Sequence, residues 1–314
     1  FVSFCGKGYF CPELNGKHFN KIVMKNLFTK FSLIAALCAI AVSSVSCDDD
    51  NKKNTPPPFS SELIGSYKPA SVSRPTAADP EEMQEYYLTF DVTWTDPDNI
   101  PEIDLTEIFG FPYQMPMNTV LSMVEAIGSG IVKGGLIGVE LKNDGSFGAQ
   151  YKDLIVEGTD VSAILGALLN PKFGEEVKSF PNAETSEILP EGAIGYYTKD
   201  SKLYFKIGRD FLKAAGGADL DVPALIDGLL TQYPSLGIVS ADDYYAIPLK
   251  YVQENGVVKV YVDRAMMVPF LDVFSSLLGS LDSSVTMGID AGKIIKDLKD
   301  NTTEMEIALR LQKI

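Results

Sequence analysis

Side chains that commonly act as nucleophiles or metal ligands are scarce in this chain. Its cysteines are Cys5, Cys11, Cys38 and Cys47, and its one histidine is His18. All except Cys47 precede or lie within a segment with the pattern of a cleaved export signal, so the processed chain would keep one cysteine and no histidine. This composition excludes Ser-His-Asp and Cys-His catalysis, zinc sites built from thiolate or imidazole, and structural disulfides. Carboxylate, lysine, tyrosine and serine chemistry remain for an enzyme.

The export pattern occupies residues 24–46. Lys25 and Lys30 form a cationic start, residues 31–42 are an apolar run, and small residues follow. The run is shorter than the roughly 20 residues that cross a bilayer. A buried core helix is the alternative, but it leaves the cysteine and the acidic run behind it unexplained. We therefore predict a signal peptide at 24–46 and interpret residues 1–23, which precede Met24, as upstream sequence from a misplaced start.

Cys47 is the reactive residue of this segment. With Val45 and Ser46 before it, it resembles the lipobox of bacterial lipoproteins, although Ser44 stands where leucine is usual. The resemblance implies that Cys47 is lipidated and becomes the first residue of the mature chain. A single acyl chain anchors only marginally, so stable attachment requires the several chains that such lipoproteins carry.

Three aspartates, Asp48, Asp49 and Asp50, follow directly. They resemble the surface-export tag of Bacteroidetes lipoproteins, and the alternative is a solvated run of charge. The resemblance implies a lipid-anchored protein of the outer membrane that is exposed at the cell surface. Residues 47–61, which contain three consecutive prolines, then predict an extended, lipidated tether.

The charge of the chain limits its partners. Removing residues 1–46 takes away five of 27 basic and one of 42 acidic residues, which leaves a net charge of −19. Nucleic acid requires lysine and arginine for its phosphates, so it is excluded as a partner, and a peripheral grip on anionic lipid is disfavoured. The sequence does not identify protein partners.

Residues 62–314 predict one domain of the α+β class that is mainly β. Turn signals at residues 143–145, 199–201 and 254–256 each separate two strand-like runs, and helical patterns follow each pair. Residues 85–95 predict one further strand, and residues 303–312 predict the last. We expect a curled antiparallel meander sheet or barrel of about 8–10 strands, built from hairpin-helix units, with apolar helices at one end.

The start of this domain carries a second resemblance. Gly65 and Tyr67 resemble the Gly-x-Trp first strand of lipocalin-like proteins, with tyrosine in the tryptophan position. The resemblance implies a calycin-like barrel in which a basic residue of the last strand lies over this aromatic ring, and Arg310 is the matching candidate. The alternative is that Tyr67 is an ordinary strand aromatic. The helices between the hairpins depart from the simple lipocalin plan.

Other motifs give weaker signals. Asp96, Asp98 and Glu107 have part of a calcium-loop spacing, but proline stands where the loop needs glycine. The glycines of residues 128–138 spell no phosphate-binding motif and fit a helix that ends at a strand. Aspartates at 219, 221 and 227 fit capping and surface positions. No metal site and no cofactor is expected.

Paired tyrosines offer one binding surface. Six aromatic residues are candidates for a sugar-stacking surface: Trp94, Tyr113, Tyr196, Tyr197, Tyr244 and Tyr245. For each of them, packing in the core or on the sheet is the alternative. The leading functional hypothesis is a non-enzymatic binding module for an apolar or glycan ligand at the cell envelope. A structural or assembly lipoprotein and a carboxylate-dependent hydrolase are the alternatives.

Overall fold

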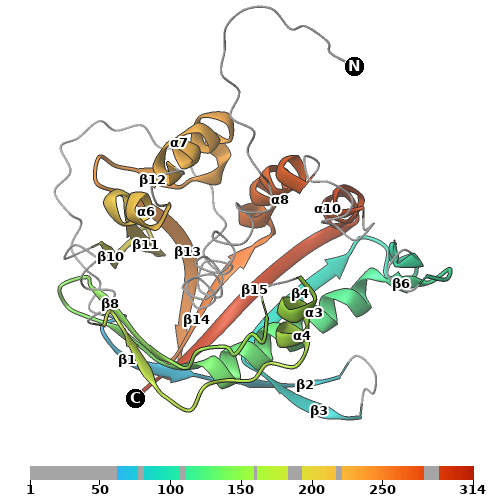
Figure 1. Cartoon of the computed structure of the whole chain (residues 1–314), viewed down its shortest axis with the longest axis horizontal. Coiled ribbons are helices and arrows are strands. Elements are labelled where there is room, and N and C mark those ends of the chain that lie inside the picture. The colour runs from blue at the N-terminus through green and yellow to red at the C-terminus, as the bar shows by residue number, and fades with distance from the viewer. Residues whose placement is uncertain are drawn as a thin grey trace, which may run out of the picture.

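The computed structural model describes residues 62–76, 81–106, 110–158, 161–182, 193–216, 221–278 and 290–314. Most of the strands in these ranges belong to one large antiparallel sheet, whose strand order is β10-β11-β13-β14-β15-β1-β7-β8-β9, with β12 paired to β13 and β4 paired to β15 (Figure 1). Within the described ranges the sheet is curled but is not closed by strand pairing. Its strands are β1 (Gly65–Pro69), β4 (Leu88–Trp94), β7 (Leu136–Leu141), β8 (Phe147–Tyr151), β9 (Lys178–Phe180), β10 (Ile194–Lys199), β11 (Lys202–Gly208), β12 (Val239–Ser240), β13 (Tyr244–Glu254), β14 (Val257–Asp263) and β15 (Thr302–Lys313).

Two small sheets and the helices surround this large sheet. The two-stranded sheets are β2 (Val72–Pro75) with β3 (Met83–Tyr86), and β5 (Glu102–Asp104) with β6 (Gln114–Pro116). The helices are α3 (Met117–Gly135), α4 (Val161–Leu169), α6 (Arg209–Gly216), α7 (Val222–Gln232), the 3-10 helix η1 (Pro234–Leu236), α8 (Arg264–Leu278) and α10 (Ala291–Asp300). Figure 1 shows α6, α7, α8 and α10 gathered above the sheet and α3 with α4 along its lower side, so the helices do not all lie at one end.

The three predicted turns join paired antiparallel strands. Asn255 and Gly256 have φ values of 52° and 77°, as a type I′ turn between β13 and β14 requires. Asp200 and Ser201 have φ values of 52° and 58° between β10 and β11, and Gly145 has a φ of 79° between β7 and β8. Local turn chemistry therefore sets these three registers.

The single strand predicted at residues 85–95 is wrong, because the chain divides there. β3 pairs with β2, whereas β4 pairs with β15 of the large sheet. Between them, the Tyr87 N–H donates to Ser129 Oγ of α3 at 2.8 Å instead of to a strand. The alternation within β4 holds as predicted: Leu88, Phe90 and Val92 pack on the core, and the residues between them lie on the other face.

The curl brings the β10 edge onto the β7–β8 turn. The Tyr196 N–H donates to the Gly145 carbonyl at 2.8 Å, and Ser146 forms an isolated bridge with Gly195. A Cβ atom at Gly195 would lie 2.5 Å from that carbonyl oxygen, so the approach requires glycine. Two backbone contacts therefore bring together the two sides of the curl.

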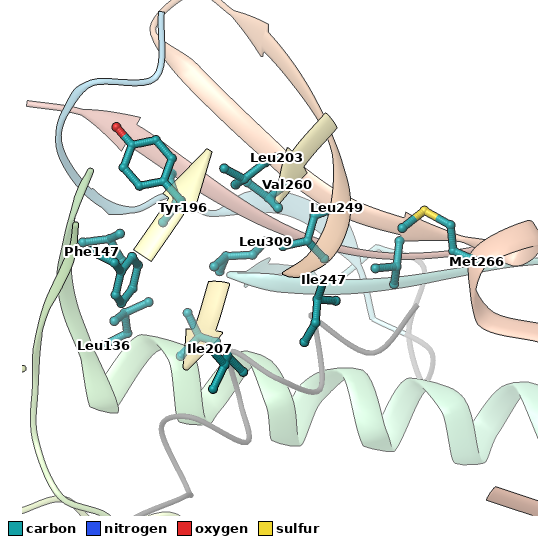
Figure 2. Packing of buried hydrophobic residues seen from close by; sticks show 14 of the residues in the cluster. Leu136, Phe147, Tyr196, Leu203, Ile207, Ile247, Leu249, Val260, Met266 and Leu309 are labelled. Atoms are coloured by element: carbon teal, nitrogen blue, oxygen red, sulfur yellow. The ribbon is translucent and has the colours of Figure 1, made fainter. Parts of the chain in front are cut away.

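The apolar core fills the inside of the curl. Alternate residues of β10, β11, β13, β14 and β15 point inward, and Figure 2 shows part of this packing, including Tyr196, Leu249, Val260 and Leu309. Each of these four side chains is at least nine-tenths buried. The opposite face of the same strands, which we call the outer face, carries nearly all of their charged residues, together with buried residues such as Tyr197, Ala246 and Ala308.

Candidate functional site

A groove of about 510 Å³ lies on the outer face where α8 begins. β4, β14 and β15 supply its floor, and the first turn of α8 supplies one wall. Its lining is mostly polar: Asp91, Thr93, Tyr261, Asp263, Arg264, Ala265, Thr303, Glu304, Met305 and Glu306. The volume lies within the roughly 300–1,000 Å³ range of sites for small ligands.

Three carboxylates cross the groove in one row. Asp91 on β4 is directly opposite Glu306 on β15, and Glu306 is directly opposite Asp263 on β14. Directly opposed residues share a face with Cβ atoms roughly 5 Å apart, where like charges destabilise a sheet. We call these three residues the carboxylate row. Its repulsion requires compensation.

A cation on each carboxylate provides that compensation. Arg74 of β2 binds Asp91 in bidentate fashion, with N–O distances of 2.6 and 2.9 Å. Lys259 Nζ lies 3.1 and 3.0 Å from the two Glu306 oxygens, and Lys250 pairs with Asp263. The row is therefore neutral overall, and its carboxylates are held in fixed orientations with lone pairs left for a ligand.

The remaining groove residues add hydroxyl, aromatic and acidic groups. Thr93 Oγ1 donates to Glu304 at 3.2 Å, and this glutamate is exposed. Lys259 Nζ lies 4.4 Å from the centroid of the Tyr261 ring. The Arg264 guanidinium donates to the Lys299 carbonyl at 2.7 Å, which ties the start of α8 to α10. Fixed acceptors beside an aromatic ring suit a polyhydroxylated ligand.

A half-buried charge network behind the groove positions Asp91. Arg74 also contacts Glu125 of α3 at 3.2 Å, and Glu125 accepts the Phe90 N–H at 3.3 Å on the free side of β4. Burial raises the pKa of Glu125 above its ordinary value, while Phe90 and Arg74 oppose the rise. No strand of the described residues pairs with this edge of β4, and α3 covers it with acceptor side chains.

The interior of the curl is almost filled by side chains. The cavity that remains among them is about 60 Å³. The Tyr67 hydroxyl donates to the Leu63 carbonyl at 2.8 Å, and the Tyr196 hydroxyl donates to the Lys142 carbonyl at 2.7 Å. Burial raises the pKa of Tyr196 to about 12. The volume of this cavity is far below the roughly 300 Å³ at the lower end of the range for ligand pockets.

The proposed barrel signature is split between the two faces. Gly65 has a φ of 149° at the start of β1, and Tyr67 points into the core directly opposite Lys313. Arg310 is an odd number of residues from Lys313 and so lies on the outer face, where it donates to Thr89 Oγ1 at 3.1 Å. Lys313 Nζ, 6.0 Å from the ring centroid, is the cation near Tyr67. Arg310 does not lie over that ring.

Alternation also separates the paired tyrosines. Tyr196 and Tyr245 are buried on the inner face, whereas Tyr197 and Tyr244 lie on the outer face. Tyr197 stacks on Tyr204, with ring centroids 4.7 Å apart, and only 6% of its surface is exposed. Trp94 packs against the core, and Tyr113 meets Phe111 edge to face. These aromatics form no single stacking surface.

The other predicted motifs have structural roles where they are described. Asp96 Oδ1 accepts the Asp98 N–H at 3.1 Å, and Glu107 lies outside the described residues. α3 ends at Gly135 and β7 begins at once, as the glycine-rich segment predicted. A Cβ atom at Gly128 would lie 2.6 Å from Leu88 Cδ2, so that glycine allows close helix packing.

Asp221 and Asp227 differ in role. Asp221 caps α7 by accepting the Ala224 N–H at 3.1 Å, as predicted. Asp227 instead binds Arg209 through both oxygens, at 2.6 and 2.9 Å, and the Arg209 guanidinium lies 4.2 Å from the Tyr245 ring. The Arg209 hydrogen bonds lower the pKa of Asp227 to about 2. This pair ties α7 to α6, and Asp219 lies outside the described residues.

The predicted anchor residues Cys47, Asp48, Asp49 and Asp50 also lie outside the described residues. Of the helices that are described, none has the length and apolar character to cross a bilayer. Within the same ranges, no cluster of three or more acidic, histidine or cysteine side chains is arranged for a metal ion. No family model, curated protein or solved structure matches this chain.

Sequence reasoning missed the groove, although part of its signal is present. The polar phase of the last strand contains Glu304 and Glu306, and that of β4 contains Asp91 and Thr93. The alternation places each pair on one face. It cannot show that β4 pairs with β15, which is what assembles the carboxylate row from segments more than 200 residues apart.

Proposed function

We propose that this protein is an exported lipoprotein of the cell envelope that binds a glycan in the outer-face groove. The export pattern and the lipobox resemblance support the location, with Cys47 as the lipidated residue. The proposal treats the domain as an open variant of the lipocalin-like plan, built from hairpin-helix units. The two sides of its curl meet through backbone contacts at Gly145 and Gly195.

The groove is the observation that carries the proposal. Its volume, about 510 Å³, suits two or more sugar rings, whereas the apolar interior keeps about 60 Å³. This contrast favours a polar ligand over an apolar one. The cations on Asp91, Glu306 and Asp263 favour a neutral sugar over an organic cation, because they already neutralise the row.

Glycan binding is tested with the full chain in detergent on a panel of neutral oligosaccharides. Glu304→Gln removes a carboxylate of the groove that pairs with no cation within the described residues. Since a charged acceptor contributes about 1.5 kcal/mol or more, we expect about tenfold weaker binding of the best panel member. Glu254→Gln, at an exposed strand end away from the groove, is the matched control. Wild-type protein that binds no panel member would contradict the proposal.

The anchor is tested by growing the producing cells with labelled palmitate. We expect label on the wild-type protein and none on Cys47→Ala, which is released from the membrane fraction. Unlabelled wild-type protein, or membrane retention of the alanine variant, would contradict the anchoring part of the proposal and leave the groove unaffected.

A further inference from the structure

Three lysines lie in register across the outer face beside the groove. Lys199 on β10 is directly opposite Lys202 on β11, and Lys202 is directly opposite Lys250 on β13. We call these three residues the lysine row. Like charges opposed across neighbouring strands destabilise a sheet. The strands would pair equally well with neutral residues here, so the row has a cost that folding alone does not explain.

Only part of that cost is offset inside the protein. Lys250 pairs with Asp263, but no carboxylate of the described ranges lies within ion-pair distance of Lys199 or Lys202. Lys206, four residues from Lys202 on the same face of β11, also has no carboxylate of the described ranges within ion-pair distance. Its Nζ lies 4.4 Å from the Tyr244 ring centroid. Asp200, in the turn between β10 and β11, is the nearest acidic residue in sequence.

The charge of this surface is opposite in sign to the net charge of the whole chain. The protein has a net charge of −15, with 42 acidic and 27 basic residues. Uncompensated lysines on such a background form a local positive surface, which attracts anions at short range. Lysine presents a compact, hydrated charge and binds carboxylate, sulfate or phosphate without a fixed geometry.

The lysine row leads directly into the groove. Lys250 is directly opposite Tyr261, and Tyr261 lines the groove. Neighbouring strands are about 4.8 Å apart, so Lys202 lies about 10 Å from Tyr261 along the row. An extended chain in the groove therefore reaches the lysines without leaving the outer face.

We propose that the lysine row binds the anionic substituents of an acidic glycan whose neutral part occupies the groove. This inference rests on the proposed function and names the ligand class more narrowly, as a sulfated, phosphorylated or uronate-containing polysaccharide. The carboxylate row and the lysine row should respond differently to salt. Contacts at the neutralised carboxylate row depend little on salt, whereas exposed lysine contacts weaken as salt rises.

The test uses the full chain in detergent with matched neutral and sulfated saccharides: dextran with dextran sulfate, and agarose hexasaccharide with its sulfated form. We expect the sulfated member of a pair to bind about tenfold more tightly at low salt, as two exposed ion pairs would give. The advantage disappears at high salt. The double variant Lys199→Gln, Lys202→Gln removes it at low salt and leaves binding of the neutral member unchanged.

Lys213→Gln is the matched control, since it removes one exposed lysine from α6, outside the lysine row. It should retain the tighter binding of the sulfated member, and no variant should unfold below the wild-type midpoint. The inference is overturned if the wild type binds the sulfated and neutral members equally at low salt, or if the double variant still prefers the sulfated member. Either result leaves the groove proposal standing. Failure of every neutral and sulfated saccharide to bind overturns both.

A membrane is the competing partner for an exposed lysine surface. Vesicles of phosphatidylcholine with and without phosphatidylglycerol test it with a soluble Cys47→Ala form of the chain. Lysine-dependent binding to the anionic vesicles, without any preference for sulfated saccharides, would overturn the inference in favour of a lipid surface.

Discussion

The inner and outer faces of the large sheet are made by the same strands and have opposite characters. On β15, Leu309 and Leu311 point inward and are almost fully buried, while Glu306 and Arg310 point outward. The cavity lined by the inner face is about 60 Å³, and the outer face carries a groove of about 510 Å³. The comparison teaches that alternation along one strand separates the residues that form the core from the residues that line the groove.

The largest expected loss of stability comes from a substitution on the inner face. Leu309→Ala removes a side chain that is 3% exposed and should lower the free energy of unfolding by about 2–5 kcal/mol. Val252→Ala on the outer face, where the side chain is 38% exposed, should change it by about 0.5 kcal/mol or less. Urea denaturation measures both. Equal losses would contradict the division between the faces.

A second test concerns the contact between the two sides of the curl. Gly195→Ala should destabilise the protein by about 1–3 kcal/mol, because the new Cβ would meet the Gly145 carbonyl oxygen, which cannot move aside as a side chain can. Gly228→Ala in α7 is the control. Apart from its chain neighbours and its own helix backbone, no atom of the described residues lies within 4 Å of its Cβ position, so the alanine should stabilise by about 0.5–1 kcal/mol. An unchanged melting temperature for Gly195→Ala would show that the contact is loose.

Two helix carboxylates, Asp227 of α7 and Glu125 of α3, should affect stability with opposite pH dependence. The pKa of Asp227 is lowered from 3.8 to about 2, so its contribution to stability is present above pH 3.8 and is lost as pH falls toward 2. The pKa of Glu125 is raised above 4.5, so its contribution is largest below pH 4.5 and declines as pH rises through the raised pKa. Denaturation of wild type, Asp227→Asn and Glu125→Gln between pH 2 and 7 measures both slopes. Slopes of the same sign would refute this assignment.

The smallest expected effect concerns the repulsion between lysines on the outer face. Lys202→Gln should raise the free energy of unfolding by a few tenths of a kcal/mol, because Lys202 stands between two opposed lysines. Lys213→Gln should leave it unchanged. High salt should remove the difference between wild type and Lys202→Gln. A loss of stability in Lys202→Gln would mean that the lysine has a partner inside the fold.

The sequence predicts what neighbouring residues decide. Asn255-Gly256 selects a type I′ turn, Asp221 caps the helix that follows it, and the alternation of Leu88, Phe90 and Val92 identifies a buried face. These features depend on contacts within a few residues, so each could be predicted without knowing the rest of the fold.

The sequence does not predict what distant residues decide. Pairing of β4 with β15 joins Asp91 to Glu306, and no local pattern encodes it. The placement of Arg310 over Tyr67 required a register as well as a motif, and the observed register puts Lys313 there. The lysine row likewise needs the pairing of β11 with β13, which are separated in the chain by α6, α7, η1 and β12.

Fluorine NMR of the fluorotyrosine-labelled protein tests most directly whether the ligand binds the outer face. Tyr261 lines the groove, whereas Tyr67 and Tyr196 line the interior, and each resonance is assigned by a tyrosine-to-phenylalanine variant. With the best-binding oligosaccharide of the panel, the Tyr261 resonance should shift while those of Tyr67 and Tyr196 stay in place. A shift of the interior tyrosines with Tyr261 unmoved would show that the ligand enters the curl and would contradict the account.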